Sequence, residues 1–455
     1  MQAENPRPES LPRARFGVAD ELSCYYDAPA EPCNVHVEVR IPGHLNEHAL
    51  RRATWAALAD QPRAQVRRAQ RGWWQRSYAW EVPREPDVDP LSVVAWADED
   101  NLAHQRMQFL SAAPPLESSP PVRLLLASGP GEDCLILNAH HAALDGISCL
   151  ELVRGIARHY SRSGGPAPAA PMPANGAGPA VERSADPASP RPGRRAGGVL
   201  PRPAARIAAE ARPAEADQVG YGFRLITFER VPRLPRTGRE PRATVNDLLI
   251  SALIVAIGRW NVSHGRSPGR IRITMPVNSR EPGQAGAAGN LSRLASVTAG
   301  PPPAPLTDGD LWPLVADVAA QTLATKASSG AQVDPLSRAL TAAWCPAAVK
   351  RRLLRLALRT AGPLICDTSL VTNLGIVADP LRFGAAAASH MWFSTSAHMP
   401  RGMSVGAVTL GGRLHLCLRY RHALFSEPAA ARFAETYSAA LSDITSQGVE
   451  HDRQH

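Results

Sequence analysis

A proline-rich stretch limits most strongly what this chain can fold into. Residues 161–217 contain eleven prolines, many alanines and glycines, and no aromatic side chain. Such a segment cannot bury enough apolar surface to offset the entropy lost on ordering. We therefore expect a mostly flexible linker, with a short helix near residues 204–211. It would divide the 455 residues into an N-terminal lobe, residues 1–160, and a C-terminal lobe, residues 218–455.

Both predicted lobes mix strand and helix patterns. In the first lobe, strands are predicted at 35–41, 122–127 and 134–139, and helices at 46–60 and 147–160. In the second, strands are predicted at 221–230, 270–277, 369–373, 403–410 and 413–420, and helices at 244–260 and 427–444. Each lobe is thus predicted to be an α/β unit, a mixed sheet flanked by helices in a two-layer α+β sandwich.

Composition indicates a globular protein, and the apolar pattern predicts that it is cytoplasmic or at most bound to a membrane surface. Apolar residues make up 44% and charged residues 20% of the chain. Residues 1–15 do not resemble a signal peptide, and the strongest apolar run, residues 248–257, is too short to span a bilayer. Seven cysteines are scattered without a CxxC pair, so neither a disulfide framework nor a zinc–cysteine site is expected.

The charge balance favours anionic partners. The chain carries 50 basic and 41 acidic residues, a net charge of +9. The charge is dispersed and no nucleic-acid-binding module is present, so we expect no nucleic-acid partner. Arg351, Arg355 and Arg359 recur every four residues, which predicts a basic amphipathic helix over 350–359. It could meet an acidic carrier protein, a CoA phosphate or a membrane surface, or be the solvated face of a packed helix.

The segment best suited to chemistry is Asn-Ala-His-His-Ala-Ala-Leu-Asp-Gly at residues 138–146, which follows an apolar strand. Neighbouring residues on a strand point to opposite faces, so His140 and His141 cannot both face one substrate. Asp145 lies where the chain turns, and Gly146 permits a close or left-handed backbone approach. A neutral imidazole can take a proton from an alcohol or amine and then protonate a thiolate leaving group. A metal site is not expected, because the two histidines diverge and no third ligand stands at helical spacing.

This HHxxxDG motif resembles the active-site motif of the chloramphenicol acetyltransferase-like superfamily. Within that superfamily, the chain looks most similar to condensation domains and to wax ester synthase/diacylglycerol acyltransferases. Similar segments are found at 120–124, 244–249, 276–280, 289–290 and 369–375, so the resemblance covers about residues 16–445 outside the linker. Two departures blur the subfamily. Leu374 replaces a usual proline, and residues 382–384 keep only a remnant of an Asp-Phe-Gly-Trp-Gly motif.

The resemblance implies two chloramphenicol acetyltransferase-like lobes with a central tunnel. His141 would be the general base near the middle of that tunnel, and His140 would be structural. Asp145 would pair with Arg280 and hold the two halves in register.

Four further residues are weaker candidates. Asn246 and Asp247 match the Asn-Asp helix of the wax ester synthase-like proteins, or simply begin a helix that Thr244 caps. Asn290 and Ser396 are candidates for contact with the substrate or with the oxyanion of a tetrahedral intermediate.

By this resemblance the chain would move an acyl group from acyl-CoA, or from an acyl- or peptidyl-carrier thioester supplied in trans, to an alcohol or amine. A place in specialised metabolite or lipid biosynthesis would follow. No permanently bound cofactor is expected, since the thioester donor is a substrate. Two alternatives stay open: an epimerase-type variant, and a catalytically idle condensation-like protein that binds a carrier or synthase.

Overall fold

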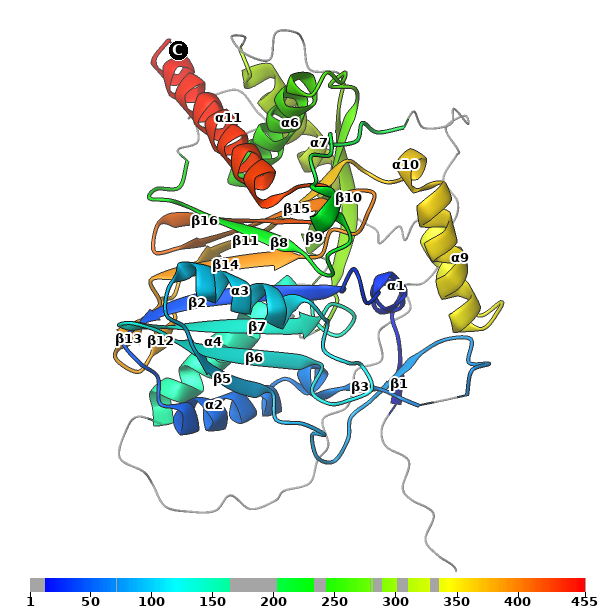
Figure 1. Ribbon diagram of the computed structural model, residues 1–455, viewed down its shortest axis with the longest axis vertical. Coiled ribbons are helices and arrows are strands. Elements are labelled where there is room, and N and C mark those ends of the chain that lie inside the picture. Colours follow the sequence, from blue (N-terminus) through cyan, green and yellow to red (C-terminus); the bar gives the residue numbers. More distant parts are fainter. Residues whose placement is uncertain are drawn as a thin grey trace, which may run out of the picture.

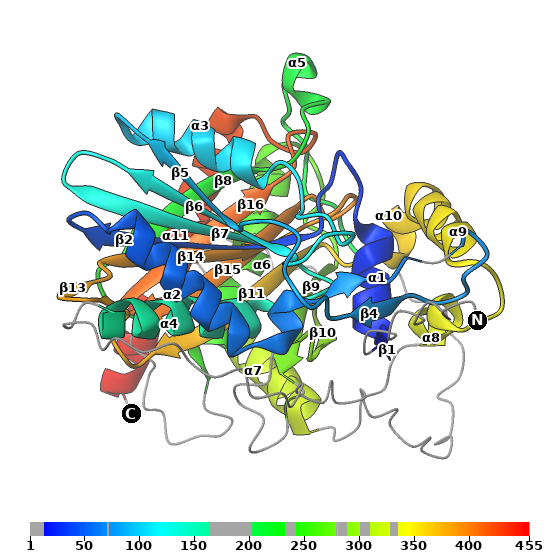
Figure 2. The same cartoon turned by 90° about the horizontal axis from the view of Figure 1, so that it is seen from below.

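The computed structural model describes residues 13–70, 72–163, 203–232, 243–278, 280, 289–300, 310–327 and 335–454. Within them lie two large sheets, each covered by helices (Figures 1 and 2). The predicted α/β class with mixed sheets is therefore confirmed. Most of the predicted linker, residues 164–202, lies outside the described residues.

The first sheet has five strands in the order β14-β2-β7-β6-β5. Their bounds are His390–Thr395 (β14), Asn34–Pro42 (β2), Glu132–His140 (β7), Val122–Ser128 (β6) and Leu91–Ala95 (β5). Alternate residues of β7 enter different cores. Leu135 and Leu137 pack with α2 (Glu47–Ala59) and α4 (Gly146–Ser163), whereas Cys134 and Ile136 pack with α3 (Glu99–Leu110). Both faces are covered, which explains why β7 is a nearly continuous apolar run.

The second sheet has six strands in the order β10-β9-β11-β15-β16-β8. Their bounds are Ser292–Ala299 (β10), Ile271–Asn278 (β9), Ser369–Val377 (β11), Met403–Leu410 (β15), Arg413–Tyr420 (β16) and Gly222–Phe228 (β8). Helices α6 (Val245–Ser263), α7 (Trp312–Ala327) and α11 (Glu427–Gln454) lie together over one face in Figure 1. Thr244 caps α6 as predicted, in a capping box with Asp247. By length and composition α6 could cross a membrane, but 78% of its apolar window is buried, as in the core helix of a globular lobe.

Two small sheets and several more helices complete the fold. A three-stranded sheet has the order β1 (Arg13–Arg15), β4 (Ala79–Glu81), β3 (Arg67–Arg68), and a two-stranded sheet joins β12 (Arg382–Phe383) to β13 (Ala386–Ala387). The remaining helices are α1 (Val18–Tyr26), η1 (Pro62–Gln65), α5 (Pro213–Ala216), α8 (Pro335–Thr341), α9 (Ala347–Thr360) and α10 (Gly362–Ile365). The predicted basic helix is α9, which lies beside α1 in both views (Figures 1 and 2).

The structure corrects the prediction for residues 203–217. Residues 204–211 form no helix. They run as a largely buried chain against α6, where Asn261 Oδ1 accepts from the Ala208 amide at 2.8 Å and Trp260 Nε1 donates to its carbonyl at 2.9 Å. Ile207 and Ala208 belong to the core of the second lobe. Side chains of α6 thus satisfy the backbone groups that a helix would have paired internally.

The structure also departs from the predicted division into two lobes at one strand. β14 comes from the C-terminal part of the chain, yet it pairs antiparallel with β2 of the first sheet, from His390 opposite Arg40 to Thr395 opposite Val35. It also lies close against β15: a Cβ added at Gly406 would stand 1.9 Å from the Phe393 carbonyl oxygen. One strand of the second part therefore joins the two sheets.

Candidate functional site

The two histidines of the motif lie at the end of β7, where the sheet gives way to a turn. The His141 amide donates to the Cys33 carbonyl at 2.9 Å, and the His140 amide donates to the Pro121 carbonyl at 3.0 Å. His140 is the buried member of the pair, with 2% of its surface exposed. Its Nδ1 accepts from the Ala142 amide at 3.1 Å, so its proton lies on Nε2, 3.8 Å from a carboxylate oxygen of Asp27.

His140 therefore has a structural role, because its ring lies between the turn that follows it and Asp27 at the end of α1. Burial alone would raise the pKa of Asp27, but the nearby His140 ring, the hydrogen bond from the Cys33 amide and the Arg351 charge lower it overall. The Asp27 carboxylate also accepts from the Cys33 amide at 2.9 Å. This small network fixes the segment whose carbonyl receives the His141 amide.

His141 is half-buried, and its two ring nitrogens differ. Nδ1 is buried and has no hydrogen-bond partner among the described residues, so the accessible edge of the ring is the one that carries Nε2. Burial lowers the pKa of His141 below 6.5, against the raising effects of its own backbone carbonyl and of Asp145. The imidazole is thus neutral at pH 7. Its backbone carbonyl accepts from Asn290 Nδ2 at 3.1 Å.

Asp145 is buried four residues further on and makes an ion pair across the molecule. Arg280, which follows β9, donates to both of its carboxylate oxygens at 2.9 Å, as the resemblance implies. The same carboxylate accepts from the Ser148 amide and hydroxyl at 2.9 Å and from the Leu291 amide at 3.1 Å. Although burial would raise its pKa, Arg280 and Ser148 hold that pKa below the usual value. The carboxylate is fully engaged and organises the turn.

Gly146 begins α4 at a point of close approach. Its backbone is not left-handed. A Cβ there would lie 2.6 Å from Phe393 Cζ and 3.0 Å from Leu374 Cδ2. The small residue thus lets the start of α4 pack against side chains of β14 and β11. Of the two reasons expected for this glycine, the structure supports the close approach.

The comparisons with known proteins bear on the fold around this site. No protein-family model matches the chain. The uncharacterized protein Rv2305 of Mycobacterium tuberculosis is 28% identical over 445 residues, which cover 94% of this chain and 98% of Rv2305. Among solved structures, a mutant starter condensation domain of rhizomide synthetase in complex with C8-CoA superposes with a TM-score of 0.62 at 12% identity, covering 95% of this chain and 94% of that one.

The chain has the condensation-domain fold. Two more solved structures agree. SgcC5 of Streptomyces globisporus, in complex with a naphthyl ethanediol and sucrose, gives a TM-score of 0.60 at 15% identity, with 95% of this chain and 99% of that chain covered. The epimerization domain of tyrocidine synthetase B gives 0.55 at 13% identity, with 98% and 99% covered. The fold consists of two chloramphenicol acetyltransferase-like lobes, as the resemblance implied.

Asn290 and Ser396, the two residues predicted to contact the oxyanion, form hydrogen bonds with other groups. Asn290 Nδ2 donates to the His141 carbonyl and, at 3.3 Å, to Ser23 Oγ, which uses both amide hydrogens. The Ser396 hydroxyl donates to the Pro32 carbonyl at 2.6 Å and accepts from the Asn34 amide at 2.9 Å. Neither side chain has a donor left for an oxyanion, so both position backbone near the site.

Asn246 and Asp247 belong to the start of α6. Asp247 accepts from the amide and the hydroxyl of Thr244, each at 2.7 Å, and from Thr322 Oγ1 at 2.7 Å. Asn246 Nδ2 contacts Met275 Sδ at 3.7 Å. These contacts support the helix-capping interpretation of the pair.

The sequence analysis did not identify Arg419. This residue lies on β16 of the second sheet and forms hydrogen bonds with Asn34 near the site. Its guanidinium is fully buried and donates to the carbonyl of Asn34 at 3.1 Å and to its side-chain oxygen. Asn34 Nδ2 in turn donates to Asn138 Oδ1 at 2.8 Å. Burial lowers the pKa of Arg419 to about 10, and its guanidinium lies 4.2 Å from the Tyr221 ring centroid. In sequence it is one arginine among 48, in an ordinary strand pattern, so no local signal marks it.

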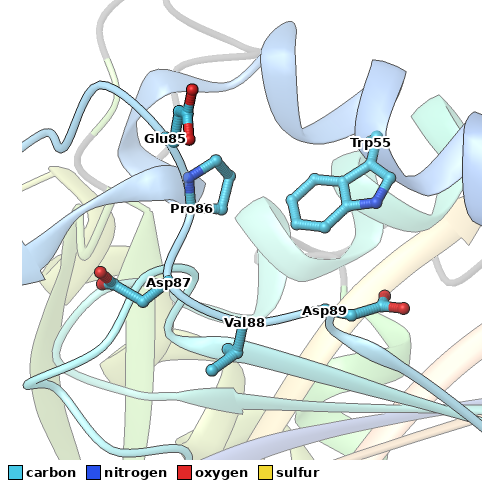
Figure 3. Close-up of a pocket in the computed structure, with 6 residues that line it drawn as sticks. All are labelled: Trp55, Glu85, Pro86, Asp87, Val88 and Asp89. Carbon is cyan, nitrogen blue, oxygen red and sulfur yellow. The ribbon is translucent and has the colours of Figure 1, made fainter.

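Away from His141, the described residues form a hollow but no metal site. Among the described residues, no group of three or more His, Cys, Asp or Glu side chains is arranged to hold a metal ion. A hollow of about 380 Å³ lies between α2 and the segment before β5. Figure 3 shows the residues that line it. The hollow is lined by Trp55 and residues 85–89 and shares no residue with the site described above.

Proposed function

We propose that this chain is an acyltransferase that moves an acyl group from a CoA or carrier-protein thioester to an alcohol or amine. The observation that carries the proposal is the state of His141: a half-buried imidazole with a pKa below 6.5, at the end of a central strand, with its Nε2 edge accessible. The fold supports it, because similar structures contain C8-CoA in one case and a diol in another.

In the proposed mechanism, the buried Nδ1 of His141 carries the proton. Nε2 then has its lone pair free to take the proton from the acceptor hydroxyl or amine as that group attacks the thioester carbonyl. The tetrahedral intermediate collapses with cleavage of the carbon–sulfur bond. The imidazolium returns its proton to the leaving thiolate, so no covalent acyl-enzyme forms.

Other residues would act through His141. Asn290 holds its carbonyl, Cys33 holds its amide, and Asp145 with Arg280 fixes the turn that follows it. These are positioning residues. The predicted tunnel, the acyl chain and the acceptor belong to the proposal as well, and a place in specialised metabolite or lipid assembly is consistent with the fold.

The test is thiol release from a panel of acyl-CoA and acyl-carrier thioesters, with and without a mixture of alcohols and amines. We expect acceptor-dependent release that falls by about 10²–10⁴-fold in His141→Ala, the usual range for a general base. His104→Ala is the matched control, because His104 is exposed on α3. It should leave the rate unchanged.

Three results would contradict the proposal. Release that is equal in wild type and His141→Ala would remove the general base. Deuterium uptake at the α-carbon of an aminoacyl thioester without any acceptor would indicate epimerisation. A folded wild type that releases no thiol from any donor, yet binds a carrier, would favour the catalytically idle alternative.

A further inference from the structure

One side of the molecule exposes many large apolar side chains. Half of the sixteen exposed large hydrophobic residues in the described part of the chain come from residues 72–78 and 335–366. They are Trp73, Trp74, Trp344, Val349, Leu353, Leu356, Leu364 and Ile365. Scattered single exposed hydrophobics are ordinary, but a gathered set marks an interaction surface. We call these eight side chains, with the arginines between them, the α9 face.

Contacts between the segments make the α9 face continuous. The Ala347 amide, at the start of α9, donates to the Gln75 carbonyl at 2.8 Å, next to the exposed Trp73 and Trp74. Lys350 Nζ donates to the Arg76 carbonyl at 2.8 Å. Helix α10 follows α9 after a single residue. Figures 1 and 2 both place α9 and α10 together at one side of the molecule, beside α1.

The α9 face is strongly basic. Residues 335–366 contain five arginines, besides the buried Lys350, and no aspartate or glutamate. Arg352 and Arg359 are exposed and have no ion-pair partner among the described residues. Arg351 and Arg355 both donate to the backbone carbonyl of Asp27 at 2.5 Å, so they also attach the helix to the end of α1.

We propose that the α9 face binds the surface of an anionic lipid bilayer. Arginines beside exposed tryptophans and leucines on an amphipathic helix are the chemistry of interfacial membrane binding. Tryptophan is favoured at the level of the lipid headgroups, and each nearby cation adds attraction to anionic lipid. A bilayer can also cover apolar side chains from a loop and two helices at once. Binding to a bilayer through the α9 face would not require acyl transfer at His141.

The face lies next to the candidate active site. Asp27, whose carbonyl receives Arg351 and Arg355, places its carboxylate 3.8 Å from His140 Nε2. A protein held on a bilayer by the α9 face would therefore keep the end of α1, and the turn that carries His141, near the membrane.

Co-flotation of the full chain with vesicles tests the proposal. We expect binding to equimolar phosphatidylglycerol and phosphatidylcholine, and much weaker binding to phosphatidylcholine alone. Arg352→Gln with Arg359→Gln should lower the partition coefficient by roughly 25-fold. Each of the two cations is expected to strengthen binding to the anionic surface by about 5-fold, and the two factors multiply. Leu353→Gln with Leu356→Gln should lower it by about 10-fold or more, because apolar burial in the interface is lost.

The matched controls are Arg266→Gln with Arg270→Gln, and Val262→Gln with Leu323→Gln, all exposed side chains of the second lobe. Both double variants should bind vesicles like wild type. Quenching of tryptophan fluorescence by brominated lipid should fall in Trp73→Phe with Trp74→Phe.

The proposal is overturned if wild type binds neither kind of vesicle, or if the control variants lose as much binding as the α9 variants. It is also overturned if an acidic acyl carrier protein binds the α9 face while vesicles do not, since the partner would then be a protein.

Discussion

The imidazole of His141 is the group on which the proposed chemistry depends, and its protonation should control the rate. Burial keeps its pKa below 6.5, so the neutral base predominates at pH 7. We predict that kcat/KM falls as the pH is lowered through that reduced pKa, because the imidazolium cannot accept a proton. A pH profile of thiol release measures it. A midpoint above 6.5 would contradict the burial argument.

The buried pair of Asp145 and Arg280 is the second feature at this scale. Removing one partner leaves the other charge buried and unpaired, so Arg280→Ala should lower the free energy of unfolding by about 3–5 kcal/mol. Adding Asp145→Ala should cost less than the sum of the two single changes, because the stranded charge is removed. Urea unfolding measures both. Arg266→Ala, an exposed control, should stay within about 0.5 kcal/mol of wild type.

At the scale of elements, β14 is the contact between the two sheets, and two glycines permit its close packing, Gly406 against β15 and Gly146 against the start of α4. Gly146→Ala would place a methyl group 2.6 Å from the Phe393 ring, and Gly406→Ala would place one 1.9 Å from the Phe393 backbone oxygen. We expect a loss of about 1–3 kcal/mol for the first and a larger loss for the second, because a side chain can shift more cheaply than the backbone of a central strand.

Combining each glycine variant with Phe393→Leu distinguishes the clash at Gly146 from the clash at Gly406. Phe393→Leu should relieve the cost of Gly146→Ala, whose clash is with the ring, and leave the cost of Gly406→Ala unchanged. Gly300→Ala is the control, since nothing lies within 4 Å of its Cβ position. Equal relief at both positions, read from thermal or urea unfolding, would mean that the strand backbone moves as well.

At the scale of the whole molecule, His398 and His415 are held in the neutral form. Burial lowers the pKa of His398 to about 3 and that of His415 to about 4. Between pH 6.5 and 4 the unfolded chain therefore binds protons that the folded chain does not. The free energy of unfolding should fall as the pH is lowered through this window, before most carboxylates titrate.

Urea midpoints at pH 7 and pH 5 measure this loss. His415→Leu removes one of the responsible groups, so its stability should depend less on pH over the same range. His104→Ala, at an exposed position, should keep the slope of wild type. A variant with an unchanged slope at position 415 would show that other groups cause the acid sensitivity.

The local parts of this protein could be predicted from its sequence because they depend on neighbouring residues. The apolar run of β7, the cap of α6 by Thr244 and the basic helix α9 all follow from periodicity and short-range hydrogen bonds. Alternation along a strand also separated His140 from His141, and the structure buries the first. The pair of Asp145 and Arg280 came from the motif resemblance, since residues 135 positions apart give no local signal.

What only the tertiary structure decided are the contacts between distant segments. β14 joins the first sheet because backbone pairing depends on where the strand lies in space, and its sequence is simply apolar. Residues 204–211 favoured a helix by composition, but side chains of α6 satisfy their backbone groups instead. Asn290, Ser396 and Arg419 took their positioning roles only once folding had brought their partners within hydrogen-bond distance, and no pattern in the chain specifies that distance.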